Sequence, residues 1–336
     1  MAVQKCDEEK DIKFVIENLS VGQADCFLIT LENSLKDTCT ILVDGNCEKD
    51  NVRRRSGLIE RISELEKLDY IVVTHCDNDH LGGILELFDQ CDGRPGTRDL
   101  SSQLADTAII YNRVTTGVIS YKQAERFEQL IRERKIINTC SRSYDNKNAM
   151  LKLLPLRKRG ILKFNEQYKD NAFLTFLNPD RDGVNQVYND YRRWRGDKKR
   201  KEYAALINRQ SIAFMLEFAK KRVLFLGDAN WRDIEKKLDA VPELKRCDLI
   251  KIPHHGAAQN NTGIVDWAQT HTCKRFIVTG KKIWDEKHPD KDLIESFYKT
   301  SGVPLTFYTD VILTIDSETG PLPGYGVSTI DVINDG

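Results

Sequence analysis

The 336-residue sequence contains no long hydrophobic run. A membrane-spanning helix needs about 20 mostly apolar residues, so no such helix is expected. The first residues lack the basic-then-apolar order of a secretion signal. Nine cysteines, an odd number without any C-x-x-C pair, do not resemble a disulfide framework. We therefore expect a cytoplasmic protein with reduced cysteines and no membrane partner.

Net charge is also missing, because 51 Lys and Arg balance 51 Asp and Glu. The balance argues neither for nor against a polyanionic partner, so only local clusters of charge can be informative. Histidine is scarce as well, with six in the chain and none between His80 and His254. The length and the 40% hydrophobic content suffice for one large domain with a core. Apolar patterns predict strands at 13–18 and 173–177 and a helix at 121–134.

The most informative stretch is residues 71–83, where an apolar run is followed by Thr-His-Cys-Asp-Asn-Asp-His-Leu-Gly-Gly. The run predicts a strand, and the periodic apolar residues after the glycines predict a helix. Imidazole nitrogens and carboxylate oxygens bind divalent metals. The loop between strand and helix is therefore predicted to hold two adjacent cations, one near His75 and Asp77 and the other near Asp79 and His80. The alternative is a chance cluster on a solvated loop.

Three other predicted strands also end in Asp or His. Asp44 follows the strand at 40–43, Asp228 follows the strand at 222–226, and His254 and His255 follow the strand at 248–252. For Asp44 alone, a turn is the simpler explanation, because Asp-Gly is a common turn pair. The repetition predicts that distant loops converge on one site.

A basic segment stands out from the balanced charge of the chain. Its basic and aromatic residues are Arg192, Arg193, Trp194, Arg195, Lys198, Lys199 and Arg200. Basic groups neutralise phosphates and aromatic rings stack on bases, so the segment is a candidate single-stranded nucleic-acid surface. A solvated charged loop is the alternative.

These motifs resemble a known family. The 75–80 segment resembles the H-x-H-x-D-H signature of the metallo-β-lactamase fold, with Asp77 in place of the middle histidine. In this form, together with Val-Gly-Gln at 21–23 and His-His-Gly at 254–256, it is similar to the hydrolase domain of the competence protein ComEC. The resemblance implies an α/β, four-layer αββα sandwich. It further implies one domain over residues 1–336, with a less alignable insertion at 92–205.

The resemblance also implies roles for individual residues. The metal ligands would be His75, Asp77 and Asp228 for the first ion and Asp79, His80, Asp228 and His254 for the second, with Asp228 shared between the two ions and Asp44 orienting a ligand. His254 is favoured over His255 as the ligand, although the sequence does not decide between them. Asp79, His255, Lys287 and His288 would act on the substrate. Replacing an imidazole by Asp77 shifts the preference from zinc toward manganese or magnesium, and we expect two divalent ions with manganese as the favoured metal.

The expected activity is a metal-dependent phosphodiesterase or nuclease that hydrolyses nucleic acid, with DNA as the expected substrate. One alternative is a phosphodiesterase for a small molecule such as a cyclic nucleotide. Another is a partner-binding component of a multi-protein system, for example in phage defence.

Overall fold

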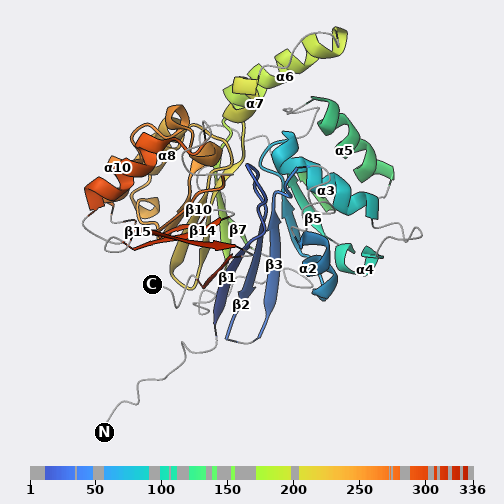
Figure 1. Ribbon diagram of the computed structural model, residues 1–336. Helices are drawn as coiled ribbons and strands as arrows, with labels where there is room; N and C mark the ends of the chain where they lie inside the picture. Colours follow the sequence, from blue (N-terminus) through green and yellow to red (C-terminus); the bar gives the residue numbers. More distant parts are fainter. Residues whose placement is uncertain are drawn as a thin grey trace.

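In the computed structural model, two β-sheets pack face to face and helices cover both outer faces (Figure 1). The structure describes residues 12–34, 36–47, 57–90, 99–105, 107–111, 121–133, 138–141, 153–155, 172–197, 204–271, 273, 275–280, 288–301, 306–308, 311–316, 320–325 and 328–331. The architecture is therefore the four-layer αββα sandwich expected from the sequence.

The first sheet has seven strands in the order β16-β1-β2-β3-β4-β5-β6. Their bounds are β1 Lys13–Asn18, β2 Phe27–Glu32, β3 Thr38–Val43, β4 Tyr70–Val72, β5 Ala108–Tyr111, β6 Asn138–Ser141 and β16 Ser328–Asp331. Strands β16 to β3 are antiparallel, whereas β3 to β6 run parallel. The parallel half brings the ends of β3 and β4 to the same edge.

The second sheet repeats this plan in the order β13-β12-β11-β10-β9-β8-β7. Its strands are β7 Leu153–Pro155, β8 Phe173–Asn178, β9 Ala213–Phe218, β10 Lys221–Phe225, β11 Leu249–Lys251, β12 Arg275–Ile277 and β13 Thr306–Tyr308. Strands β10 to β13 are parallel. A separate hairpin pairs β14 Val311–Asp316 with β15 Gly320–Tyr325.

The helices divide between the two outer faces (Figure 1). Helices α2 Leu58–Glu64, α3 Asn78–Gln90, α4 Ser101–Leu104 and α5 Tyr121–Glu133 lie on the side of the first sheet. Helices α8 Trp231–Asp239, α9 Ile264–Thr270 and α10 Lys291–Ser301 cover the second, and α6 Arg181–Gly196 and α7 Ala204–Arg209 lie at one end of the sandwich. The buried apolar residues form three clusters, one between the sheets and one under each helical layer.

Two features differ from the sequence predictions. Helix α3 begins at Asn78, so Asp79 and His80 lie in its first turn rather than on a loop, and Gly82 and Gly83 are inside the helix. The described parts of 92–205 add β5 and β6 to the first sheet and β7 and β8 to the second, and of these strands β6 and β7 were not predicted. The short strands are hard to recognise between long polar connections. None of the described helices is long and apolar enough to cross a membrane.

Candidate functional site

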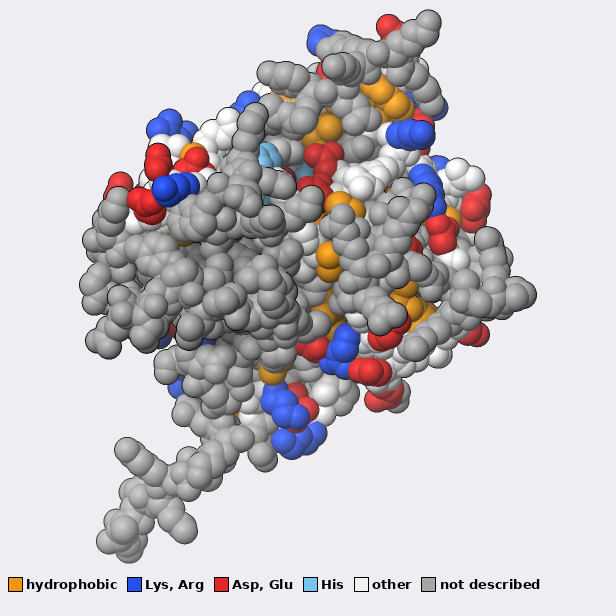
Figure 2. All heavy atoms as spheres, in the orientation of Figure 1, with side chains coloured by type: hydrophobic (Ala, Val, Ile, Leu, Met, Phe, Trp, Pro, Cys, Tyr) orange, Lys and Arg blue, Asp and Glu red, His pale blue; other side chains and the backbone are white. Residues whose placement is uncertain are grey.

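The carboxyl ends of parallel strands from both sheets meet at one edge of the sandwich. Asp44 follows β3, His75 follows β4, Asp228 follows β10, and His254 and His255 follow β11. Such edges are where α/β sheets place their ligands, because loops from several strands converge there. The site lies at this edge, and Figure 2 shows histidine and acidic side chains together at the surface there.

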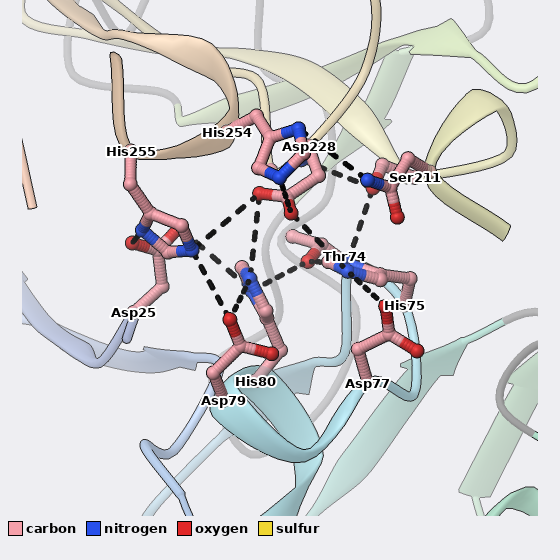
Figure 3. A network of polar contacts seen from close by, with 12 residues as sticks. Asp25, Thr74, His75, Asp77, Asp79, His80, Ser211, Asp228, His254 and His255 are labelled. Atoms are coloured by element: carbon pink, nitrogen blue, oxygen red, sulfur yellow. Dashed lines mark hydrogen bonds and ion pairs between the residues drawn. The ribbon is translucent and has the colours of Figure 1, made fainter. Parts of the chain in front are cut away.

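The Asp228 carboxylate lies at the centre of the cluster (Figure 3). Its Oδ2 atom is 3.6 Å from His75 Nε2 and 3.7 Å from His254 Nε2. Asp77 Oδ2 is on the same side, 3.7 Å from His75 Nε2. These residues form the first group: His75, Asp77, His254 and one oxygen of Asp228.

The other oxygen of Asp228 faces a second group. Oδ1 is 3.4 Å from His80 Nε2 and 3.9 Å from His255 Nε2. Asp79 Oδ2 closes this group at 3.2 Å from His255 Nε2 and 4.0 Å from His80 Nε2. One carboxylate therefore stands between two sets of imidazoles, each with an acid of its own.

The two adjacent histidines lie differently from the sequence prediction. His254 was grouped with Asp79 and His80, but the structure places His255 in that group and His254 in the first. Both residues have positive φ, 49° and 50°, so the chain turns sharply between them. This turn lets neighbouring side chains approach Asp228 from two sides. Sequence spacing could not show it, because positive φ is uncommon outside glycine.

Every histidine of the cluster is held through Nδ1. Asp44 Oδ2 accepts from His80 Nδ1 at 2.8 Å, and Asn260 Oδ1 lies 3.1 Å from His254 Nδ1. Asn260 donates through Nδ2 to the Asp228 carbonyl, which leaves its Oδ1 as the acceptor. Both rings are therefore held from the Nδ1 side, and their Nε2 atoms point to the cluster.

Threonine hydroxyls fix the other two rings in the same way. Thr74 Oγ1 donates to Asp44 Oδ2 at 2.7 Å, so it accepts from His75 Nδ1 at 3.1 Å. Thr279 Oγ1 donates to Asp25 Oδ1 at 2.5 Å, so it accepts from His255 Nδ1 at 2.9 Å. All four imidazoles thus direct Nε2 toward the cluster, and loss of any Nε2 proton gives the form that binds a metal.

Buried atoms at the centre support a cation site directly. His75 Nε2, His80 Nε2 and Asp228 Oδ1 are buried without a hydrogen-bond partner. Buried polar atoms normally have a partner, so a missing group is expected there. Ligand atoms of His75, His80 and Asp228 lie within 4.8 Å of one another, as do those of Asp79, His80 and His255. The donor set fits two divalent ions, with nitrogen and oxygen ligands for each.

The approach of the two sheets at this edge requires a glycine before the central acid. Gly227 has φ of +49°, and a β-carbon there would lie 2.8 Å from Thr74 Cβ. Thr74 holds both His75 and Asp44, so a side chain at 227 would displace the hydrogen bonds behind the first group. Glycine accepts this conformation without strain.

Several residues of the site are not among the predicted site residues, although Ser211 together with Asn208 matches a family N-x-x-S pattern. Ser211 Oγ accepts from the Asp228 backbone N–H at 3.0 Å and lies 3.1 Å from His75 Nδ1. Thr279 and Asn260 come from positions where the sequence marks no motif. Asp25 lies two residues after the Val-Gly-Gln motif, and Lys251 lies three residues before the histidine pair. Their charge and their proximity to these motifs are the signals that could have identified them.

The remaining predicted residues lie beside the first group, on the surface of α6, or outside the described residues. The His288 ring is 4.9 Å from the His254 ring, so it lies beside the first group. Lys287 lies outside the described residues, as do Lys198, Lys199 and Arg200. Arg192, Arg193 and Arg195 are exposed on the last turns of α6.

Trp194 does not offer a surface for stacking on bases, and that prediction is wrong. Its side chain is buried and packs against Tyr121 and Tyr191, with ring centroids 5.3 and 6.1 Å away. Successive residues of a helix are about 100° apart, so Arg193 and Arg195 lie to either side of the face that Trp194 occupies, and here that face is the core under α5 and α6. The exposed surface of this turn is therefore basic without an aromatic platform from Trp194.

Without a cation, the buried acids and histidines of the cluster shift one another's pKa values. Burial lowers the pKa of His75 to about 3, and the neighbouring His80 acts in the same direction. Burial also acts against charged His255, but the acids Asp228, Asp25 and Asp79 outweigh it and raise the pKa of His255 to about 9. For Asp228, burial favours protonation, yet His80, His255 and His75 hold its pKa well below the usual range. In the metal-free protein, the ionised carboxylates therefore stabilise a proton on a neighbouring imidazole such as His255, where a metal ion would otherwise supply the positive charge.

Stability of the metal-free protein is expected to fall as pH rises from about 6.5 to about 9, by roughly 1–3 kcal/mol. In this window folded His255 binds a proton that the unfolded histidine has released, so the folded state loses its advantage as pH passes the folded pKa. His75 is neutral in both states here and adds no slope. Urea unfolding after metal removal measures the effect, and His255→Asn should flatten it. A stability that rises across the window would contradict this account.

Comparisons with known proteins agree with the architecture. Residues 19–100 match the family described as the Metallo-beta-lactamase superfamily. This range contains Asp44 and the 75–80 segment and ends before Asp228. A comparison with curated proteins gave no match.

Several solved structures are similar to this chain at low sequence identity. The metallo-beta-lactamase fold protein YhfI from Bacillus subtilis is 11% identical, with 96% of this chain and 100% of that chain covered and a TM-score of 0.47. A diphosphatase from the PhnP family is 12% identical, with 95% and 98% covered and a TM-score of 0.44. A long form RNase Z from yeast is 12% identical, with 98% and 42% covered and a TM-score of 0.45. Similarities at this level carry no argument about substrate.

The two-sheet sandwich, its helical layers and the cluster at the strand ends agree with one conclusion. The chain has the metallo-beta-lactamase fold, and its residues 19–100 match the Metallo-beta-lactamase superfamily.

Proposed function

We propose that this protein is a metal-dependent phosphodiesterase that hydrolyses nucleic acid, with DNA as the expected substrate. The observation that carries the proposal is the central Asp228, whose two oxygens face separate pairs of imidazoles. Two divalent ions held there would activate water and neutralise charge developing on a phosphoryl group. The closer similarity to ComEC, on which the choice of substrate partly depends, rests on the sequence motifs.

The ligand types support a choice of metal. The first group would hold its ion with two imidazoles and the carboxylates of Asp77 and Asp228, and the second with two imidazoles and those of Asp79 and Asp228. Two carboxylates in each set make both positions hard, which favours manganese, with zinc or magnesium as other occupants. We propose manganese as the working ion.

The residues at the opening would act on the substrate. Asp79 is 29% exposed as a side chain, so one face of it reaches the solvent beside the second group. It is the proposed acceptor for a proton from the attacking water. His288, beside His254, is the proposed donor to the leaving oxygen, because its ring lies at the rim and outside both ligand groups.

The basic end of α6 is tied to the same opening. Its Tyr191 and Trp194 pack on Tyr121 at the start of α5. Two residues further along α5, Gln123 donates to Asn78 Oδ1 at 2.7 Å, and Asn78 lies between Asp77 and Asp79. Arg192, Arg193 and Arg195 are exposed on the same turns of α6 as Tyr191 and Trp194. They are the proposed contacts to phosphates away from the cut bond.

A small phosphodiester such as a cyclic nucleotide is the second candidate. The burial of Trp194 favours it, because a base-stacking ring is absent from this turn of α6. The two candidates differ in what the arginines should do, since a small substrate does not extend to α6.

The test uses protein loaded with manganese, single-stranded and duplex DNA, RNA, and bis(p-nitrophenyl) phosphate. Changing Arg192, Arg193 and Arg195 together to serine should raise KM for a DNA oligonucleotide at least about 10-fold and reduce the salt slope by up to roughly 2. Cleavage of the small diester should not change. The matched control changes Lys13, Lys36 and Lys67 to serine, at the opposite edge of the first sheet.

The possible outcomes separate the candidates. If no nucleic acid is cut with manganese, magnesium or zinc while a known nuclease cuts it, the nuclease proposal fails. If a cyclic dinucleotide is cut and the serine variant behaves like wild type, the small-molecule candidate replaces it.

A further inference from the structure

A lysine without access to solvent lies behind the second group. Lys251 is the last residue of β11 and is 1% exposed to solvent. Its ammonium forms an ion pair with Asp25 Oδ2 and lies 3.5 Å from the Gly227 carbonyl, to which it donates. Burying an ion pair carries a desolvation penalty that apolar side chains of similar volume would not carry. A buried pair at this position therefore suggests a role beyond packing. The pair joins the two sheets next to the site, and neither member belongs to the two ligand groups.

Asp25 touches each member of the second group. Its backbone N–H donates to the Asp79 carbonyl at 3.1 Å. Its Oδ2 lies 3.8 Å from His80 Nδ1, and its Oδ1 lies 3.5 Å from His255 Nδ1. Thr279 links Oδ1 to the same His255 nitrogen. Among the described contacts of Asp25, none reaches His75, Asp77 or His254, whereas Lys251 donates to the Gly227 carbonyl that also accepts from the His254 backbone N–H. The direct side-chain contacts of the pair with histidines are therefore those with the second group.

The surrounding charges explain why a lysine is needed. Asp25 and Asp44 are both buried, and both carboxylates approach the Nδ1 side of His80. Together with His80 they form a set whose ligand atoms lie within 4.8 Å of one another. The Lys251 ammonium already pairs with Asp25, so the chain itself supplies the positive charge behind His80. Without it, the Asp25 charge would be buried and uncompensated, and a rearranged Asp25 would take His255 and Thr279 with it.

We propose that Asp25 and Lys251 are a positioning pair that sets the affinity of the second cation position without contacting the cation. The inference rests on the proposed function insofar as Asp79, His80 and His255 must bind a divalent ion. The pair holds the Nδ1 sides of His80 and His255, so it fixes where both Nε2 atoms point. Groups that orient metal ligands in this way change metal affinity by about 10–100-fold when removed.

The test titrates metal-free protein with Mn²⁺ by calorimetry and follows the spin-coupled manganese pair by electron paramagnetic resonance. Lys251→Met keeps the length and removes the charge. It should weaken the second binding step about 10–100-fold and leave the first step at its wild-type affinity. Lys237→Met is the matched control, because Lys237 is partly buried but lies on α8 and donates to Asn178, away from both groups.

A double variant distinguishes positioning from packing. Asp25→Asn with Lys251→Met removes both charges, and it should recover part of the lost second-step affinity because no buried charge is left without a partner. A purely structural role would show no such rescue. If Lys251→Met does not fold, the second-step affinity of Asp25→Asn, in which Lys251 is buried without its partner charge, is compared with that of the double variant.

The outcomes are decisive in both directions. A selective loss of the second step with rescue in the double variant supports the inference. An unchanged second step, an equal loss in both steps, or no rescue overturns it. Wild-type protein that binds no Mn²⁺ would instead refute the proposed function, so the two failures are distinguishable.

Discussion

Replacing Asp228 with alanine is expected to reduce hydrolysis at least about 1,000-fold. The change removes the one carboxylate whose oxygens face His75 and His254 on one side and His80 and His255 on the other. Both cation positions lose a ligand at once, and the imidazoles lose the charge that holds them together. Binding of both ions should weaken, in contrast to the selective loss expected for Lys251→Met. Calorimetry with Mn²⁺ and the oligonucleotide assay measure the two effects.

Asp239→Ala is the matched control for this experiment. Asp239 ends α8, is exposed, and pairs with Lys245 on the surface. Its loss should leave activity within about twofold of wild type, since surface pairs contribute little. The proposed site would be incorrect if Asp228→Ala retained full metal binding or most of its activity.

Replacing Phe214 with alanine is expected to lower the free energy of unfolding by about 3–5 kcal/mol. Phe214 is fully buried on β9, in the cluster between the two sheets. Its ring stacks on Phe225 with centroids 5.2 Å apart and lies 6.2 Å from Phe176. The variant loses the free energy gained by burying the aromatic ring, and it leaves a cavity that the neighbouring strands cannot close. For a domain of ordinary stability, this is a large fraction of the total.

Guanidinium unfolding, with and without Mn²⁺, gives the measurement. Phe173→Ala serves as the comparison, because Phe173 is at the partly exposed start of β8 and should lose about 1 kcal/mol. Added Mn²⁺ should recover part of the stability of Phe214→Ala, since the ions bind only the folded state. A cost below about 1 kcal/mol would show that the ring is not packed between the sheets.

Local patterns were sufficient for most of the elements. The strands at 13–18 and 173–177 and the helix at 121–134 appear as β1, β8 and α5 with bounds within about a residue of the prediction. Each has a strong periodic signal and clear punctuation, such as Asn-Pro after β8. By contrast, the start of α3 at Asn78 was missed. Asp79 and His80 read as loop residues, whereas the first turn of a helix also favours acids.

The sequence by itself determined that Asp44, His75, Asp228, His254 and His255 each follow a strand, because alternation and strand ends are local properties. Only the tertiary structure decided which oxygen of Asp228 each imidazole faces, since that depends on the positive φ angles at 254 and 255 and on how two sheets meet. Only the structure placed Trp194 in the core and Lys251 behind His80, because burial is set by packing between elements distant in the chain. Residue types thus indicated the chemistry, and long-range packing determined its geometry.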